Sequence, residues 1–176
     1  MSREIVLVAG SPSATSRSSY VAGVVAAQAK GAGFTARSFS VRDFDAADLL
    51  LGRVEAPAVK AFIDAVKGAA AIVLSTPVYK ATYAGALKAL VDLIPPDALT
   101  LRPALGIATT KLAAHGAGVE HAYRALFAFF RAETIDPLVV LDDELKIENG
   151  EGTLSSAARE RIDAAARRLV EAASKR

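Results

Sequence analysis

The stretch AAIVLS at residues Ala70–Ser75 decides the fold, because it is apolar at almost every position. A strand that is covered on both faces carries such a run, whereas a strand with one face in water alternates apolar and polar residues. Four other short runs are rich in β-forming residues, namely Ile5–Ala9, Phe34–Val41, Ala104–Ala108 and Ile135–Leu141. The sequence therefore predicts five strands in a sheet that is buried on both sides.

Longer stretches rich in Ala and Leu separate the five runs and are predicted as helices. These stretches are Ser18–Lys30, Ala58–Lys67, Ala84–Leu93, Gly118–Arg131 and Ser155–Ala173. Strands that alternate with helices indicate a parallel sheet covered by helices on both faces. We therefore predict an α/β fold, a doubly wound five-stranded parallel sheet in three α/β/α layers. Its strand order is either that of flavodoxin or that of half a Rossmann fold.

Length and composition favour one globular domain over residues 1–176. The chain has 176 residues, of which 52% are hydrophobic and 23% are charged, and no repeat or linker divides it. The least regular stretch, Asp43–Glu55, is either a surface connection, such as an ordinary loop with a short helix, or an arm that packs on a partner. The successive leucines at Leu49–Leu51 favour the arm slightly, because exposed apolar side chains mark contact surfaces.

Several classes of protein are excluded by composition. The chain has no cysteine, which excludes a disulfide scaffold, a zinc–cysteine site, an iron–sulfur cluster and a thiol nucleophile. Its net charge is +2 and no dense basic stretch interleaves with aromatic residues, so nucleic-acid binding is not expected. No apolar run reaches the ~20 residues of a membrane span, and Ile5–Gly10 is short for a signal sequence. We therefore expect a cytoplasmic protein without a membrane segment.

The first of three candidate ligand loops reads GSPSATSRSS at Gly10–Ser19, where a strand ends and a helix begins. Ligands of a doubly wound sheet bind beyond the carboxyl ends of its strands, and amides at a helix N-terminus, hydroxyls and a guanidinium all bind phosphate. The loop has neither the Gly-Lys-Ser/Thr of a P-loop nor the G-x-G-x-x-G of a dinucleotide site. A phosphate monoester such as that of FMN fits best, while a simple serine cap on the helix is the alternative.

The other two candidate loops are Thr76–Gly85, which reads TPVYKATYAG, and Thr109–Gly118. Pro77 removes an amide donor and stiffens the chain after its strand. Tyr79 and Tyr83 are suited to border a flat aromatic ligand. The alternative is that both rings cap the core and leave their hydroxyls in water.

The sequences GSPSATSRSS and TPVYKATYAGALKALVDLIP, at residues 10–19 and 76–95, resemble the NAD(P)H-dependent FMN reductases, a family of flavodoxin-like proteins. Within that family, the chain is most similar to the reductases that feed alkanesulfonate and methanesulfonate monooxygenases. The resemblance extends from residue 3 to about residue 145. It implies a single FMN-binding domain that transfers hydride from NAD(P)H to FMN and supplies reduced flavin to a partner monooxygenase.

The resemblance also assigns roles to individual residues. Those that would hold the FMN phosphate are Ser11, Ser16, Arg17, Ser18 and Ser19. Those that would run along the isoalloxazine ring are Pro77, Val78 and Tyr79. Thr109 and Thr110 would occupy the third flavin loop.

The chain departs from its relatives at two places in these loops. Relatives often carry Arg where this chain has Ser13, a change that weakens the grip on phosphate or leaves it to Arg17. Relatives often carry Gly-Gly where this chain has Thr109 and Thr110, which gives the site a different shape beside the ring.

His121 is the candidate for an interface feature of the sulfonate-linked reductases. In those proteins an inserted Tyr or His makes a π-bulge in the fourth helix at the tetramer interface, and His121 corresponds to it. A plain surface or interface histidine on an amphipathic helix is the alternative. The resemblance favours a homodimer or homotetramer with the flavin near the interface.

The implied chemistry asks little of the protein's own side chains. Hydride transfer between nicotinamide and flavin needs no acid or base from the protein, so we expect neither a catalytic triad nor a metal. One alternative is an enzyme that retains FMN and reduces quinones, azo dyes or metal oxyanions. Another is a non-enzymatic flavin-binding electron carrier. The sequence does not distinguish NADH from NADPH.

Overall fold

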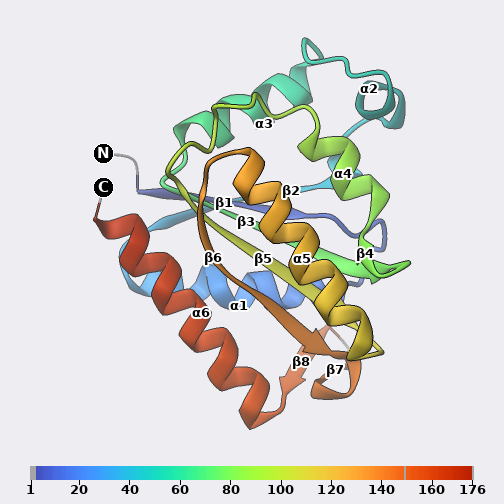
Figure 1. Ribbon diagram of the computed structural model, residues 1–176, viewed down its shortest axis with the longest axis vertical. Coiled ribbons are helices and arrows are strands. Elements are labelled where there is room, and N and C mark those ends of the chain that lie inside the picture. Colours follow the sequence, from blue (N-terminus) through green and yellow to red (C-terminus); the bar gives the residue numbers. More distant parts are fainter. Residues whose placement is uncertain (1–2, 149, 176) are drawn as a thin grey trace.

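The computed structural model describes residues 3–148 and 150–175. Five parallel strands form its central sheet in the order β2-β1-β3-β5-β6. They are β1 (Glu4–Ala9), β2 (Thr35–Ser40), β3 (Ala71–Tyr79), β5 (Pro103–Thr110) and β6 (Glu133–Leu141). The predicted doubly wound parallel sheet is confirmed, and of the two predicted strand orders the flavodoxin order is the one observed (Figure 1).

Two helices cover one face of the sheet, α1 (Arg17–Gly31) and α6 (Ser156–Ser174). Val21 of α1 and Ile162 of α6 are both fully buried, and they belong to the same apolar cluster as Val73 of β3. α6 begins at the N-cap Ser155, whose hydroxyl accepts a hydrogen bond from the Ala158 amide. These contacts seal the face on which the N-terminal and C-terminal helices lie side by side.

Three helices cover the opposite face: α3 (Pro57–Gly68), α4 (Gly85–Val91) and α5 (Ala114–Phe129). Phe62 of α3 and Ile72 of β3 are fully buried in the apolar cluster on this side. Ile72 and its neighbour Val73 therefore point to opposite faces, and both faces are covered. This double burial explains the uninterrupted apolar run that predicted β3.

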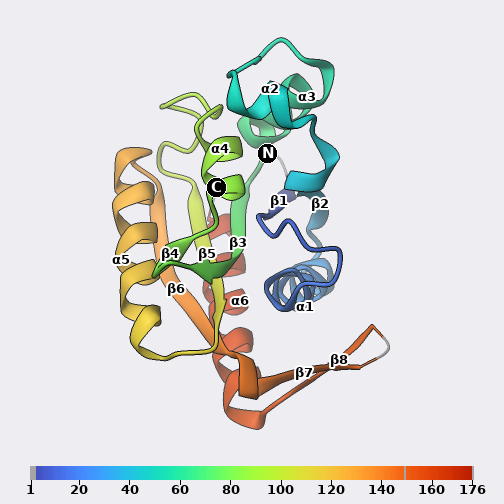
Figure 2. The same ribbon diagram turned by 90° about the vertical axis from the view of Figure 1, so that its right-hand side faces the viewer.

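The structure adds short elements that the sequence analysis did not predict. These are β4 (Thr82–Tyr83), β7 (Leu145–Glu148), β8 (Glu151–Leu154) and 3₁₀ turns at Val41–Asp43 and Asp142–Glu144. The short helix α2 (Ala46–Leu50) was one interpretation of the stretch Asp43–Glu55, without bounds. β3 also continues to Tyr79, past its predicted end at Ser75, while Val41 belongs to a turn and not to β2. Segments of two to five residues carry too little periodicity to be recognised. Figure 2 shows the antiparallel pair β7–β8 projecting from the body of the molecule.

The irregular stretch 43–55 is a surface connection that contains the short helix α2. Asp45 caps this helix, because its carboxylate accepts hydrogen bonds from the amides of Ala47 and Asp48. Leu49 packs into the core, whereas the side chain of Leu50 is 78% exposed. The alternative reading, an arm that packs on a partner, stays a prediction that this exposed leucine supports.

Tyr123 fills the space between α5 and the sheet, and a glycine makes room for it. The tyrosine is fully buried, and its hydroxyl lies 3.0 Å from the carbonyl oxygen of Leu74 and 3.1 Å from that of Ile107. Burial raises the pKa of Tyr123 well above its usual value, so the hydroxyl stays neutral and donates. A Cβ on Gly106 would lie only 2.4 Å from the tyrosine ring. Position 106 therefore excludes every side chain as long as Tyr123 keeps this place.

We predict that Gly106→Ala lowers the free energy of unfolding by about 1–3 kcal/mol, because the new methyl group overpacks the Tyr123 ring. Gly23→Ala is the matched control, since the site lies on the exposed side of α1 with no atom within 4 Å of the new Cβ. It should raise the free energy of unfolding by about 0.5–1 kcal/mol. Urea unfolding followed by circular dichroism measures both. Equal stability of the two variants would contradict the packing described.

Candidate functional site

The carboxyl ends of β1, β3 and β5 bring the three candidate loops together. In the parallel register Ala9 of β1 lies opposite Ser75 of β3, and Pro77 of β3 lies opposite Thr109 of β5. The amide of Gly10 donates a hydrogen bond of 2.7 Å to the Ser75 carbonyl oxygen. The first loop therefore lies directly beside the second, and the second beside the third.

The floor of the site is formed by Gly10 and the helix α4. A Cβ on Gly10 would lie 2.5 Å from the Cβ of Leu87 and 2.9 Å from the Ser75 carbonyl oxygen. No larger residue fits there without moving α4 or β3.

Hydroxyl groups surround the N-terminus of α1. Ser16 caps the helix: its Oγ accepts a hydrogen bond of 3.3 Å from the Ser19 amide and lies 3.0 Å from the Ser18 Oγ. Ser11 and Ser18 are buried, and the Ser11 Oγ accepts a hydrogen bond from the Ser13 amide. Hydroxyls and free amides at the positive end of a helix fit a phosphate monoester. This donor set fits the phosphate of FMN.

Arg17 bonds to a different part of the chain. Its Nε donates a hydrogen bond of 3.3 Å to the Leu145 carbonyl oxygen, and its Nη1 lies 3.8 Å from a carboxylate oxygen of Asp142. Both partners follow β6, so the guanidinium is shared with the segment at the edge of the sheet. The role of Arg17 toward phosphate stays a prediction, and in this structure the serines line the loop without it.

The second loop forms an antiparallel hairpin, which the sequence analysis did not predict. Val78 pairs with Tyr83, and Tyr79 with Thr82, in an antiparallel ladder between β3 and β4. The Thr76 hydroxyl ties the base of the hairpin, because it accepts a hydrogen bond of 2.9 Å from the Ala84 amide and donates one of 2.8 Å to the Pro77 carbonyl oxygen. The strand pairing and the Thr76 hydrogen bonds thus fix the extended backbone of Pro77, Val78 and Tyr79.

The tip of this hairpin bends through a conformation that favours glycine. Lys80 and Ala81 have φ values of 53° and 66°, although neither is glycine. The turn rests on α5 at Gly118, where a Cβ would lie 2.6 Å from the Ala81 carbonyl oxygen. The missing side chain at position 118 lets helix and turn meet. A strained turn supported in this way is typical of a functional site.

The third loop begins with two buried threonines. Thr109 and Thr110 are each 5% exposed, and the Thr110 hydroxyl accepts a hydrogen bond of 3.3 Å from the Leu112 amide. Leu112 is 53% exposed, and Tyr79 of the neighbouring hairpin is 49% exposed. Apolar surface therefore stands open at this edge of the sheet, where a flat ring would lie.

The π-bulge expected at His121 is not present in this chain. Every residue from Ala114 to Phe129 is α-helical, and His121 lies exposed on that helix. An intact helix leaves no extra residue at this position, so the likeness to the sulfonate-linked reductases does not extend to a bulge here. The exposed histidine on an amphipathic helix was the alternative interpretation.

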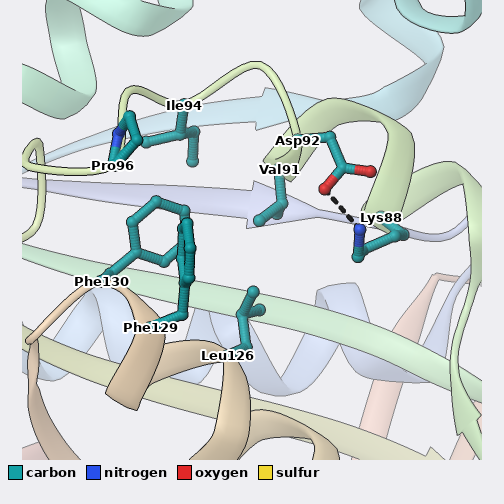
Figure 3. A pocket seen from close by; sticks show the side chains of 8 residues that line it. All are labelled: Lys88, Val91, Asp92, Ile94, Pro96, Leu126, Phe129 and Phe130. Atoms are coloured by element: carbon teal, nitrogen blue, oxygen red, sulfur yellow. Dashed lines mark hydrogen bonds and ion pairs between the residues drawn. The ribbon is translucent and has the colours of Figure 1, made fainter.

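A separate apolar pocket lies between α4 and the C-terminal end of α5 (Figure 3). Leu126, Phe129 and Phe130 face Ile94 across it, and an ion pair joins Lys88 to Asp92 at its rim. Phe129 is 64% exposed. This end of α5 leads into the start of β6, away from the loops at the strands' carboxyl ends, so the pocket is not part of the flavin site.

The part of the chain that the structure describes contains neither a candidate metal site nor a helix that could span a membrane. No group of three or more His, Asp or Glu side chains there is arranged to hold a metal ion. Over residues 3–148 and 150–175, no helix has the length and apolarity needed to cross a bilayer.

Comparison with known proteins identifies the family. Residues 3–145 match the family described as NADPH-dependent FMN reductase. The chain belongs to this family. It is 37% identical to an FMN reductase (NADPH) of Pseudomonas putida over 85% of this chain and 75% of that protein, and 34% identical to an FMN reductase (NADPH) of Escherichia coli over 82% and 75%. A crystal structure of the apo form of an NADH:FMN oxidoreductase (EMOB) superposes with a TM-score of 0.87 at 25% identity, covering 96% of this chain and 88% of that one.

Family membership confirms the predicted activity in its general form. The chain is an oxidoreductase that uses FMN and NAD(P)H. The predicted resemblance and the predicted flavodoxin-like fold are confirmed as well. The assignment of single residues to the flavin stays a prediction, supported by the way the three loops meet.

Sequence reasoning missed several residues that shape the site. Gly10, Thr76 and Gly118 lie within the three candidate loops, but no role was assigned to them; they act through a close backbone approach or a hydrogen bond to a distant amide. Thr76 directly precedes Pro77 in the sequence, and this position gives only a weak indication that its hydroxyl is buried. Nothing in the sequence indicates that Gly118 would meet Ala81, because the two lie 37 positions apart, 118 − 81.

We predict that Ser16→Ala weakens FMN binding about tenfold, because it removes a hydroxyl at the helix N-terminus that would bond to a charged phosphate. The same change should cost about 1 kcal/mol of stability through the lost cap. Ser155→Ala is the matched control, since it removes the equivalent cap of α6, whose hydroxyl bonds to the Ala158 amide and to no residue of the three loops. It should cost similar stability and leave FMN affinity unchanged, as measured by flavin fluorescence quenching. Equal FMN affinities in the two variants would exclude Ser16 from the site.

Proposed function

We propose that this reductase treats FMN as a substrate that binds, is reduced and leaves, and that the reduced flavin serves a partner monooxygenase, with sulfonate desulfonation as the expected use. The observation that carries the proposal is the character of the phosphate loop. Its one arginine, Arg17, bonds to Leu145 and Asp142, and the position after Ser-Pro holds Ser13 and not a cation. The hydroxyls and amides that remain are neutral.

A neutral phosphate loop supports exchange of the flavin. A phosphate already receives charge-assisted hydrogen bonds from hydroxyls and amides, and an arginine adds an opposite charge and two parallel bonds to these. A loop that binds phosphate through serines and the positive end of α1 holds FMN less tightly than one that adds a bidentate arginine. Moderate affinity is what an enzyme needs if its product must leave.

The bound flavin would accept hydride from the nicotinamide, and the protein supplies the geometry for that step. The β3–β4 hairpin would hold one edge of the ring, since Thr76 fixes the hairpin and Gly118 supports its turn. The exposed Tyr79 and Leu112 would exclude water from the ring where the nicotinamide stacks. No side chain needs to gain or lose a proton for this role.

We also propose that the molecule is a homodimer or homotetramer. Phe129 and the pocket beside it form an apolar surface that is exposed in one chain (Figure 3). Burying such a surface against another subunit is favourable, and aromatic side chains are enriched in interfaces. The predicted cytoplasmic location rests on the short apolar runs of the sequence, and the predicted partner monooxygenase rests on the resemblance; both stay predictions.

The decisive test is oxidation of NADH and NADPH by purified protein with and without added FMN, after its visible spectrum is recorded. We expect a colourless protein whose rate saturates with added FMN. A yellow protein that ignores free FMN but reduces quinones or dyes would favour the enzyme that retains its flavin. A protein that binds FMN but oxidises neither nucleotide with any acceptor would be an electron carrier, contrary to the proposal.

We predict that Ser13→Arg raises FMN affinity about tenfold and slows flavin release, because it adds a cation to the exposed position beside the phosphate. Ser13→Gln is the matched control: it loses the same hydrogen bond to the Thr15 carbonyl oxygen and adds a side chain of intermediate length without charge. Stopped-flow release of FMN distinguishes the two. If both variants release FMN like the unmodified protein, charge in this loop does not set the affinity.

A further inference from the structure

A second apolar pocket opens beside the phosphate loop, on the side of β2. Its volume is about 260 Å³, and it is bounded by Pro12 of the loop, by Phe44 and Leu49, and by Gly85 and Ala86 at the start of α4. Pro12 belongs to the predicted phosphate loop, and Gly85 follows the β3–β4 hairpin by two residues. The pocket therefore shares walls with the flavin site and does not coincide with it.

The turn after β2 places one arginine at the rim of this pocket. Because Ser40 of β2 lies opposite Ala9 of β1, the two strands end at the same edge of the sheet. The Ser40 hydroxyl accepts a hydrogen bond from the Arg42 amide, and the Asp43 carboxylate accepts one from the Ser40 amide. This reciprocal cap fixes the 3₁₀ turn, and with it the backbone that carries Arg42 to the pocket.

The guanidinium of Arg42 has no hydrogen-bond or ion-pair partner among the described residues, while the acidic groups near it in sequence are engaged. Asp43 bonds to the Ser40 amide, and Asp45 bonds to two amides of α2. Arg53, on the same surface segment, differs in this respect because it pairs with Asp48 at 3.2 Å. Arg42 is therefore a cation at a small apolar pocket whose charge no side chain neutralises directly.

We propose that this pocket receives the adenosine end of the nicotinamide nucleotide, and that Arg42 binds the 2′-phosphate that distinguishes NADPH from NADH. The proposal rests on the function proposed above and names the nucleotide that the site selects. An arginine presents donors that match phosphate in a bidentate manner. Arg42 follows β2 by two residues, at the same edge of the sheet as the phosphate loop that follows β1.

The shape of the pocket supports the same ligand. Small residues of α4, Gly85, Ala86 and Ala89, line the pocket together with the apolar side chains Phe44 and Leu49. A purine ring fits such a space, since ligand pockets combine apolar walls with a few placed polar groups. The pocket shares walls with the flavin site. A dinucleotide whose adenosine lies in the pocket would therefore extend toward the hairpin, where its nicotinamide would meet the flavin.

The test compares binding of adenosine 2′,5′-bisphosphate with binding of 5′-AMP by isothermal titration calorimetry of the purified protein. We expect the bisphosphate to bind at least about tenfold more tightly. Arg42→Gln should remove that difference, and the ratio of kcat/KM for NADPH over NADH should fall about tenfold. Arg53→Gln is the matched control, an exposed arginine on the same segment that should keep the difference.

A second variant tests the pocket independently of the charge. Ala89→Leu fills the space between α4 and Leu49, so it should weaken binding of both nucleotides by a similar factor. The proposal is overturned if unmodified protein binds the two nucleotides equally. It is also overturned if Arg42→Gln weakens FMN and not the 2′-phosphate preference, or if Ala89→Leu changes neither nucleotide. Nucleotide binding is measured without turnover, so its result stands apart from failure of the flavin-exchange proposal.

Discussion

The site depends on the parallel register of β1, β3 and β5, which delivers three loops to one edge of the sheet. The hydrogen bond from the Gly10 amide to the Ser75 carbonyl oxygen continues this register beyond the end of β1. The carboxyl ends of parallel strands lie at the same edge of the sheet. The loops that follow them are therefore neighbours, even though they are far apart in the sequence. The loops then need only short-range hydrogen bonds, such as the Ser16 cap and the Thr76 tie, to reach their shapes.

Glycines decide how closely the surrounding helices approach this edge. Gly10 admits Leu87 of α4, Gly106 admits Tyr123, and Gly118 admits the turn at Ala81. In each case an added Cβ would overlap a neighbouring atom at less than 3.0 Å. α4 and α5 are held against the sheet by these contacts, and both helices border the flavin edge. Packing and site geometry are therefore set by the same residues.

The one arginine of the predicted phosphate loop is engaged outside it, and a second arginine lies beside the site. Arg17 bonds to the segment after β6, and Arg42 stands at the pocket beyond Pro12. A loop of hydroxyls and amides binds a phosphate and releases it, whereas an arginine outside the loop is available to a second phosphate. This division suits an FMN reductase in which flavin and nucleotide both come and go.

The sequence by itself determined the order of the main strands and helices, because burial on both faces requires a continuous apolar run such as Ala71–Leu74. It also determined the family, through the motifs at residues 10–19 and 76–95, and it predicted the candidate ligand loops. It did not determine the hairpin at Tyr79–Thr82, the engagement of Arg17, the intact helix at His121 or the pocket beside Arg42. Each of these depends on contacts between segments distant in the chain or on a few residues of local conformation. Periodicity records which face of a segment is buried, but not which distant atom it meets, and only the tertiary structure supplies that partner.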